Sequence, residues 1–409
     1  MLRIDQVSVR NYKNLIADEL RVNNFNIIVG PNNSGKSNFI QILSFLNHII
    51  NGSIDEVRME FKRSYFSDFG WIKPLKSGEK GELLIELVFS DTIRKVQYRY
   101  KIVLGWRPQR KVKFTRIEFF IKFEDFDYKN IHKTGPPISV FKRNENSISF
   151  GTGLKGISST QIPENVSVIG LLKVLSKQFS NDDISFALKS LNSLLKTETI
   201  YFSNIELSKP GKSRMDKFSG RTVSFDIINE IVNIWEQGKD FGYFKEVLKT
   251  ILQIDDIRVL ELGSKSGDED EGKSNKEYFV MFSHMGSNKQ LWNFSDGSVL
   301  LIALITKILI SDSDIFLIEE PENSLHPKAL IDLIGFIQSF DDDRQFIIAT
   351  HSIALINNIN AEDVIIAKCL ENGLSELMRV TDSSELRKTL KQGYIVFSDL
   401  LFFSPDEIV

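Results

Sequence analysis

Hydrophobic positions recur with two different periods along the chain. Residues 1–50 predict two strands, the second being the apolar run NFNIIVG, and then a glycine-rich loop and a helix over KSNFIQILSFLNHII. From about Gly81 to Phe150, apolar and polar residues alternate, as in half-buried antiparallel strands. Helical spacing follows in residues 165–200 and 224–253 and again in the apolar run 299–310. The pattern therefore predicts an α/β fold with a mixed sheet, an antiparallel β subdomain and a helical insertion.

Composition narrows the class of protein without defining a function. The 409 residues are 42% hydrophobic and 26% charged, which suits a globular protein with a large core. A net charge of −3 excludes a polycation that binds nucleic acid through its overall charge. The single cysteine, Cys369, cannot form an internal disulfide, and we expect it in a reducing cytosol as a small buried hydrophobe. Since no apolar signal core opens the chain and the run 299–310 is too short to cross a bilayer, we predict a cytoplasmic protein without a membrane partner.

The segment GPNNSGKSN, from Gly30 to Asn38, has the spacing of a phosphate-binding loop. Glycines allow the backbone to curl so that successive N–H groups converge on phosphate oxygens, and the following helix favours an anion at its N-terminus. In this motif Lys36 reaches the β- and γ-phosphates, and the Ser37 hydroxyl is a ligand of Mg²⁺. A chance turn rich in glycine and serine is the alternative, but the predicted strand before the loop and helix after it argue against one. The predicted contacts to ATP from this loop are Gly30, Asn32, Asn33, Ser34, Gly35, Lys36, Ser37 and Asn38.

A second segment, IFLIEE at Ile315–Glu320, ends in the carboxylates that such a loop needs. Its four apolar residues predict a strand buried on both faces, and ligands bind at the C-terminal ends of strands in open α/β sheets. We therefore expect Glu319 to help hold Mg²⁺ and Glu320 to orient or deprotonate the attacking water. A surface acidic pair at a strand end is the ordinary alternative, which the intact phosphate loop disfavours.

Two further segments carry candidate contacts to phosphate. IIATHS predicts a buried strand that ends at His351, whose imidazole can donate a hydrogen bond to a γ-phosphate, and a lone histidine with a structural role is the alternative. FSDGS precedes the apolar helix, so Ser295, Gly297 and the first amides of that helix form a second anion-binding surface. An ordinary helix cap by Ser295 or Asp296 is compatible with that role, and we expect both. The predicted catalytic residues are Lys36, Glu320 and His351.

The order of the motifs resembles that of the ABC-type ATPase head of the SMC, Rad50, RecF and OLD (overcoming lysogenization defect) branch. This order is the phosphate loop, a long insertion, FSDGS, LIEEPENSLHP and IIATHS. FSDGS resembles the signature loop of that family, EEPENSLHP its Walker B segment and D-loop, and His351 its switch histidine. VSVRNYKNL resembles the opening strand and basic loop, which implies that Lys13 and Asn14 lie beside the nucleotide. The likeness covers residues 1–50 and 290–357 and does not extend to the middle of the chain.

The sequence departs from that family at two positions. Glu319 stands where many ABC ATPases have Asp, although Glu is familiar in the OLD-like branch, and Asp296 stands where LSGG-type loops have Gly. Ser295 and Gly297 remain, so the resemblance still implies that the signature loop of one subunit completes the phosphate site of another. It thus implies a homodimer or higher oligomer with ATP held across a two-fold interface, closed by ATP binding and opened by hydrolysis.

The segment between the motifs sets the chain apart within the branch. It has no coiled coil of the SMC and Rad50 kind, and after IIATHS there is no acidic constellation like that of the Toprim nuclease domain in OLD nucleases. The chain is therefore similar to the stand-alone OLD-like ATPases of bacterial anti-phage systems such as Septu, PARIS and retron-linked systems. This implies an ATPase that regulates or scaffolds a separate effector, a nuclease or a toxin. A RecF-like, ATP-dependent DNA-repair clamp and an ATP-binding scaffold with little turnover are the alternatives.

Direct binding of DNA depends on the basic residues of the predicted antiparallel strands. Residues 101–150 hold eleven Lys or Arg against five Asp or Glu, with aromatic residues among them. Such a sheet can follow phosphates and stack on bases, and a solvated sheet face over core aromatics is the alternative. The basic loop SKPGKSRMDKFSGR is a second candidate. The predicted division of the chain is an ATPase lobe over 1–155, a mainly helical insertion over 156–255 and a second ATPase lobe over 256–409.

Overall fold

The chain forms two compact units, each assembled from separate segments. The computed structural model describes residues 1–51, 81–109, 116–145, 147–151, 162–175, 182–201, 227–238, 241–264, 276–323, 325–340 and 344–379. The first unit comprises 1–199, 313–317 and 342–409, and the second comprises 200–312 and 318–341. The helices expected in the insertion divide between them. In the first unit lie α3 (Val168–Leu175) and α4 (Asp182–Leu194), and in the second lie α5 (Ile227–Gln237) and α6 (Phe241–Leu252).

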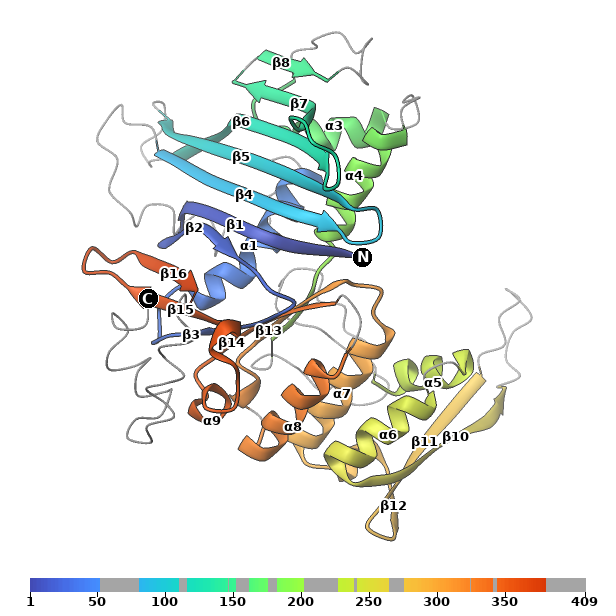
Figure 1. Cartoon of the computed structure of the whole chain (residues 1–409). Coiled ribbons are helices and arrows are strands. Elements are labelled where there is room, and N and C mark those ends of the chain that lie inside the picture. Colours follow the sequence, from blue (N-terminus) through green and yellow to red (C-terminus); the bar gives the residue numbers. More distant parts are fainter. Residues whose placement is uncertain are drawn as a thin grey trace. The chain divides into compact units, whose positions relative to one another are not determined.

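An antiparallel meander forms one half of a large mixed sheet (Figure 1). Its strands in spatial order are β2 (Leu15–Arg21), β1 (Leu2–Tyr12), β4 (Gly81–Asp91), β5 (Val96–Gln109), β6 (Arg116–Asn130), β7 (Ile138–Asn144) and β8 (Ser147–Phe150). Every neighbouring pair in this order is antiparallel. Along β4, Leu83, Ile85 and Leu87 are buried, whereas Glu82 and Glu86 point to the other face, as the sequence alternation predicts. The antiparallel strands expected between 81 and 150 are therefore confirmed in the described residues.

The other half of the sheet is built around β3 (Phe25–Val29), which has a parallel neighbour on each side. The strands of this half are β16 (Ser375–Arg379), β15 (Val364–Cys369), β3, β14 (Gln345–Thr350), β13 (Ile315–Glu319) and β9 (Glu198–Tyr201). β3 runs parallel to both β14 and β15, and β16 joins this half to β2. All six residues of β14 are buried, and so are the first four of β13, because strands of this kind are covered on both faces.

The opening segment contains one strand more than the sequence predicts. Two strands were expected before the phosphate loop, and three are present, since the chain reverses at Lys13 and Asn14 between β1 and β2. Asn11 and Lys13 have φ angles of 62° and 53°, in the left-handed region. This turn uses neither glycine nor proline, the residues that usually mark a reversal in sequence. Cys369 is a second correction, because it is exposed at the end of β15 instead of buried.

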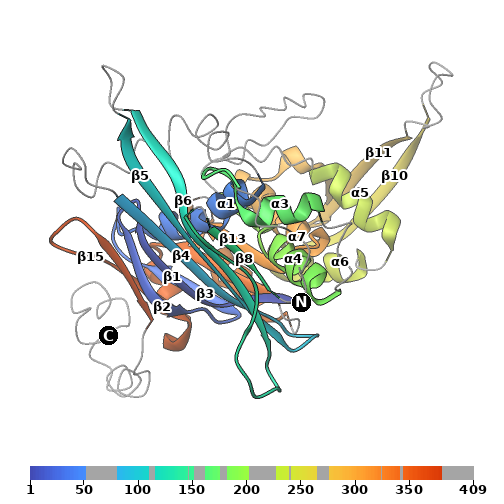
Figure 2. The same cartoon turned by 90° about the horizontal axis from the view of Figure 1, so that it is seen from above.

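Helices α1 (Lys36–Asn51), α3 and α4 lie together on one side of the sheet (Figure 2). α1 contacts α3 and β14, and α4 contacts β1 and α3. α1 is mostly buried along its length, and its Phe45 ring lies 5.0 Å from that of Tyr12 on β1. The hydrophobic core of the first unit therefore fixes the helix that follows the phosphate loop. Among the helices described, none combines the length and the hydropathy that a membrane crossing would require.

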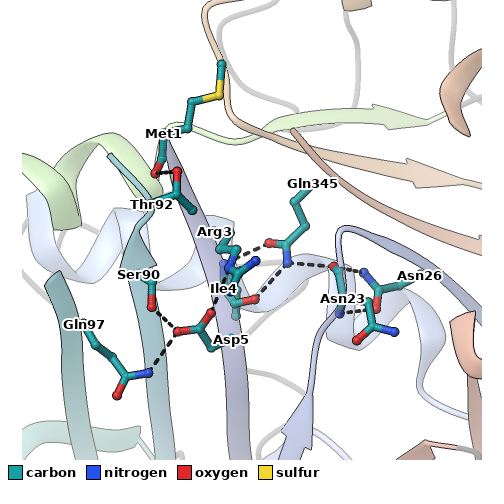
Figure 3. Close-up of polar contacts among 10 residues, drawn as sticks. All are labelled: Met1, Arg3, Ile4, Asp5, Asn23, Asn26, Ser90, Thr92, Gln97 and Gln345. Atoms are coloured by element: carbon teal, nitrogen blue, oxygen red, sulfur yellow. Dashed lines mark hydrogen bonds and ion pairs between the residues drawn. The ribbon is translucent and has the colours of Figure 1, made fainter. Parts of the chain in front are cut away.

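A side-chain amide connects the start of the chain to the parallel strands (Figure 3). Gln345 Nε2 donates to the carbonyl oxygens of Ile4 and Asn23, each at 2.8 Å, and its Oε1 accepts from the Ile4 N–H at 2.9 Å. Leu2 N–H donates to Asp314 just before β13, at 2.8 Å. β1 and β14 are not neighbours in the sheet, so the Gln345 side chain supplies the two bonds that an adjacent strand would make.

A buried carboxylate joins α3 to the antiparallel strands. Glu124 accepts hydrogen bonds from the hydroxyls of Tyr100 at 2.9 Å and Ser167 at 2.6 Å, and from the N–H of Val168 at 2.8 Å. Burial raises the pKa of the Glu124 carboxyl above its ordinary value, and the hydrogen bonds from Ser167 and Val168 oppose that rise. The first residue of α3 is thus tied to the middle of β6.

Arg143 on β7 fastens the segment that leads into α3. It is fully buried and donates to the carbonyl oxygens of Glu145, Val166 and Pro163 at 2.9, 2.7 and 3.0 Å. We expect Arg143→Met to lower the free energy of unfolding by about 3 kcal/mol, because three carbonyls lose their donor. Urea denaturation followed by circular dichroism measures this loss. The exposed neighbour Lys142→Met is the control, with an expected change within about 0.5 kcal/mol, and an equal loss in both variants would contradict the prediction.

In its described residues, the second unit combines a small sheet with four α-helices. Its antiparallel strands are β10 (Ile254–Ser264), β11 (Lys276–His284) and β12 (Ser287–Lys289), and its other helices are α7 (Asp296–Ile310) and α8 (Pro327–Gln338). α5 contacts β11 and α7, while α6 contacts β10, α7 and α8. α7 is the core helix predicted from its apolar run. Two strands flank the acidic segment 263–277 as expected, and most of that segment and all of the basic loop SKPGKSRMDKFSGR lie outside the described residues.

Candidate functional site: a phosphate loop and its surroundings

The phosphate loop leaves β3 at Gly30 and enters α1 at Lys36. A Cβ atom on Gly30 would lie 2.2 Å from the carbonyl oxygen of Ala367 on β15, so the close approach of two strands requires glycine. Asn33 and Gly35 have φ angles of 64° and 89°, in the left-handed region. These conformations curl the loop before the Phe39 N–H bonds the Gly35 carbonyl at 3.0 Å, as the helix begins. The backbone therefore has the curled form that the motif predicts.

Two polar side chains of the loop, Lys36 and Ser34, are buried. Lys36 is 5% exposed, and its Nζ donates to the carbonyl oxygens of Gly30 at 2.9 Å and Pro31 at 2.8 Å. Phosphate oxygens form stronger, charge-assisted bonds with an ammonium group than carbonyls do, so a bound phosphate can replace these partners. Ser34 is 1% exposed and its hydroxyl has no hydrogen-bond partner. A buried hydroxyl without a partner needs an explanation, and a phosphate ligand in the loop provides one.

The turn between β1 and β2 is hydrogen-bonded to the phosphate loop. Asn38 donates to the side-chain oxygen of Asn14 at 2.7 Å, and Asn14 donates in turn to the Ser375 hydroxyl at 2.7 Å. The Ser375 hydroxyl donates to the carbonyl oxygen of Asn33 at 3.3 Å, and its N–H donates to the Asn14 carbonyl at 2.7 Å. Three segments that are distant in sequence therefore hold the loop in place.

Lys13 and Asn14 both lie next to the loop and its helix. Lys13 Nζ donates to the side-chain oxygen of Gln41 on α1 at 2.9 Å. Gln41 and Ser375 are residues that the sequence motifs did not indicate. Both are parts of the loop's support through tertiary contacts, for which a sequence read along one segment carries no signal. Of the other predicted contacts, Asn32 is exposed on the loop, and Ser37 is half-buried in the first turn of α1.

His351 lies at the same edge of the sheet as the phosphate loop. β14 is parallel to β3 and pairs Thr350 with Val29, so His351 and Gly30 follow these strands at equivalent positions. The histidine is half-buried. The Ser352 N–H donates to the Thr350 hydroxyl at 3.0 Å, which fixes the turn directly after the strand. The structure thus places His351 directly after β14, at the sheet edge that also carries the loop.

The acidic pair ends β13, the strand next to β14 in the sheet. Glu319 is its last residue, and Glu319 and Glu320 are both half-buried. Glu320 has a φ angle of 50°, a left-handed conformation that is uncommon for a residue other than glycine. Its carboxylate accepts a hydrogen bond from the Asn323 amide at 2.7 Å. The predicted strand-end position of both carboxylates is therefore observed, with an unusual backbone at Glu320.

The FSDGS segment forms the start of α7. Ser295 is the N-cap, and its hydroxyl oxygen accepts from the Ser298 N–H at 3.3 Å. The cap expected at Ser295 or Asp296 is therefore Ser295, and Asp296 is the first helical residue. Ser295 and Asp296 are exposed, and Gly297 is half-buried. The first N–H groups of a helix have no intrahelical partner and carry the positive end of its dipole, which suits an anion.

Several basic residues of the antiparallel strands are engaged within the protein. Lys101 lies 2.9 Å from the Glu86 carboxylate, and Lys122 forms an ion pair with Glu82. Arg143 is buried, and the ring of Phe120 is buried and cannot stack on a base. These contacts neutralise part of the charge that indicated a DNA-binding face. The remaining basic residues of that count include Arg110, Lys111 and Lys113, which lie outside the described residues, as do the side chains of Arg107 and Arg116.

The sequence of most of the chain matches a known protein family. The chain matches one family model, described as "AAA domain, putative AbiEii toxin, Type IV TA system", over residues 25–165 and 167–357. These ranges contain the phosphate loop, FSDGS, the acidic pair and His351. The chain belongs to this AAA-domain family. Membership confirms the ATP-binding P-loop ATPase fold that the motifs predicted, while no curated protein sequence matches the chain.

Solved structures of SMC heads also align with this AAA-domain protein. An SMC head bound to the C-winged helix domain of ScpA has 14% identity and a TM-score of 0.48, covering 92% of this chain and 97% of its own. A Pyrococcus furiosus SMC head with an extended coiled coil, bound to the C-terminal domain of ScpA, has 13% identity and a TM-score of 0.47. This alignment covers 96% of this chain and 99% of the SMC chain. The Thermotoga maritima SMC head domain has 14% identity and a TM-score of 0.42, and the alignment covers 93% of this chain and 100% of the SMC chain. At these scores, conclusions about function depend on the family match and on the site.

Proposed function

We propose that this protein is a Mg²⁺-dependent ATPase whose ATP-gated dimerisation regulates or scaffolds a separate effector, a nuclease or a toxin, in cytoplasmic anti-phage defence. The phosphate loop carries the proposal, because its buried lysine, its unpartnered Ser34 hydroxyl and its closely packed Gly30 suit a bound phosphate. The family description refers to a toxin–antitoxin system, which supports a setting of paired proteins. Engagement of Lys101, Lys122 and Arg143 within the protein favours this function over a DNA-repair clamp.

Each predicted residue has a role in this proposal. Lys36 and the loop amides bind the phosphates, while Lys13 and Asn14 support the loop beside the nucleotide. Ser37 and Glu319 would hold Mg²⁺, which neutralises charge on the phosphate oxygens when bound. One hydroxyl and one carboxylate suffice because Mg²⁺ takes its other ligands from phosphates and water. Within the described ranges, His, Cys, Asp and Glu do not cluster in threes able to hold a metal alone.

The reaction itself is assigned to two side chains. Glu320 takes a proton from the attacking water or orients it, and a carboxylate at a strand end is suited to both tasks. His351 donates a hydrogen bond toward the γ-phosphate from the edge that it shares with the loop. In a dimer, Ser295, Gly297 and the amides that open α7 would complete the phosphate site of the partner subunit. Dimerisation would then depend on bound nucleotide.

The test is co-expression of the tagged chain with its flanking genes, followed by size and mass analysis with and without ATP and Mg²⁺. We expect an ATP-dependent dimer in stoichiometric complex with a nuclease or toxin. Ser295→Arg, which obstructs the start of α7 without changing the phosphate loop, should keep ATP binding and lose the dimer. A chain that remains monomeric with ATP would contradict the dimer. A dimer that carries only nucleic acid would replace the proposal with the repair clamp, and an ATP-loaded dimer without turnover would replace it with the scaffold.

A further inference from the structure

The turn that follows β13 contains a pair of contacts between two residues three positions apart. The Asn323 side-chain amide donates to Glu320 Oε2 at 2.7 Å, and the Asn323 N–H donates to the Glu320 carbonyl at 3.2 Å. Pro321–Asn323, directly after Glu320, form a single 3-10 turn. We propose that Asn323 is a positioning residue that sets the orientation of the Glu320 carboxylate toward the attacking water. This inference rests on the proposed function, in which Glu320 is catalytic.

The backbone of Glu320 shows why this carboxylate needs support. A φ angle of 50° is costly for a residue with a side chain, and it persists only where the surrounding structure determines it. Pro321 favours an extended backbone at the residue before it, which Glu320 does not adopt. The two bonds from Asn323 close this turn from both the side chain and the main chain of Glu320. An unusual conformation is therefore maintained at the residue to which the chemistry is assigned.

The chemistry of the donor suits a base. An amide N–H fixes one carboxylate oxygen without bringing a positive charge to it. Small errors in the placement of a catalytic group reduce rates strongly, so a tether of this kind acts on turnover more than on nucleotide binding.

The chain offers a matched control for this contact. On α5, the Asn233 amide donates to Glu230 Oε2 at 3.3 Å, again three residues apart. Asn233 is exposed and Glu230 is half-buried, and neither residue belongs to the predicted site. The same substitution at Asn233 and Asn323 therefore separates the loss of a local amide–carboxylate bond from an effect on the reaction.

The decisive variant is Asn323→Asp, which keeps the shape of the side chain, removes its N–H donor and places a second carboxylate beside Glu320. We expect kcat to fall about tenfold or more with KM and the melting temperature unchanged, while Asn233→Asp matches the wild type. In a Glu320→Gln background, Asn323→Asp should add no further loss, because the two residues act as one unit. Wild-type kcat in Asn323→Asp would overturn the assignment, and so would a loss that is equally large in the Glu320→Gln background.

Hydrogen exchange provides a readout that does not depend on activity. Peptides that cover the turn 320–323 should exchange about tenfold faster in Asn323→Asp than in the wild type, because opening of the turn is no longer opposed by the side-chain bond. Exchange in the α5 peptide should respond only to Asn233→Asp. If wild-type protein binds ATP without hydrolysing it, the proposed function fails. Unchanged exchange in Asn323→Asp overturns the tether itself, whatever the turnover.

Discussion

Glu320→Gln is expected to lower ATP turnover by roughly two to four orders of magnitude while ATP still binds. Glutamine cannot take a proton from water, but its amide oxygen can still accept the hydrogen bond that Asn323 donates at 2.7 Å. The turn and its left-handed residue should therefore keep their form. Since hydrolysis opens the proposed dimer, the variant should accumulate as an ATP-bound dimer. Phosphate release measures turnover, and light scattering after gel filtration measures the dimer.

The matched control for this variant lies in the same turn. Glu322→Gln makes the same chemical change two residues along the chain, at a half-buried position outside the predicted catalytic set. We expect it to hydrolyse ATP at close to the wild-type rate and to dimerise reversibly. If Glu320→Gln also turned over at the wild-type rate, Glu320 would not be the general base, whatever its backbone conformation.

Lys36→Ala is expected to weaken ATP binding about 10- to 100-fold, because charge-assisted bonds to phosphate contribute about 1.5–3 kcal/mol. Lys36 is buried inside the loop, and its Nζ lies within 2.9 Å of two loop carbonyls. Equilibrium titration with a fluorescent ATP analogue measures the affinity. Dimerisation should fail in parallel, because it depends on bound nucleotide.

The control must separate lost phosphate contacts from a collapsed loop. Removal of Lys36 also removes its bonds to Gly30 and Pro31, so the melting temperature without nucleotide should be recorded for both proteins. An exposed lysine on the β6–β7 connection, Lys133, gives a charge-matched variant, Lys133→Ala, with unchanged affinity expected. Wild-type affinity in Lys36→Ala would contradict a phosphate-binding loop at this position.

The parts of the site that could be predicted from sequence are those that one continuous segment defines. The loop from Gly30 to Ser37 combines a buried strand, a curl that needs glycine and a helix start, and each leaves a local pattern. Strand-end carboxylates and the serine cap of α7 are local in the same way. Ser375 and Gln41 left no such pattern, because their relation to the loop exists only after β16 and α1 have packed beside the first turn.

The charges of the antiparallel strands show a different limit. A count of basic residues says nothing about which carboxylate faces each one across a sheet, since that depends on strand register. Arg99 illustrates the point, because it contacts Asp125 at 3.2 Å and also pairs with Asp127 on the neighbouring strand. The hydrogen bond to Asp127 raises the pKa of the Arg99 guanidinium, as expected for a satisfied pair.

The position of β3 has a consequence for synthesis on the ribosome. This strand carries the phosphate loop, yet its two neighbours are β14 and β15, and Gln345 closes the fold onto Ile4. At roughly 5–20 residues per second, a strand near the start of translation waits on the order of tens of seconds for partners that come more than 300 residues later. During that time both edges of an apolar strand are open to pairing with other chains. The strand that carries the phosphate loop therefore reaches its final neighbours only after nearly all of the described chain has emerged.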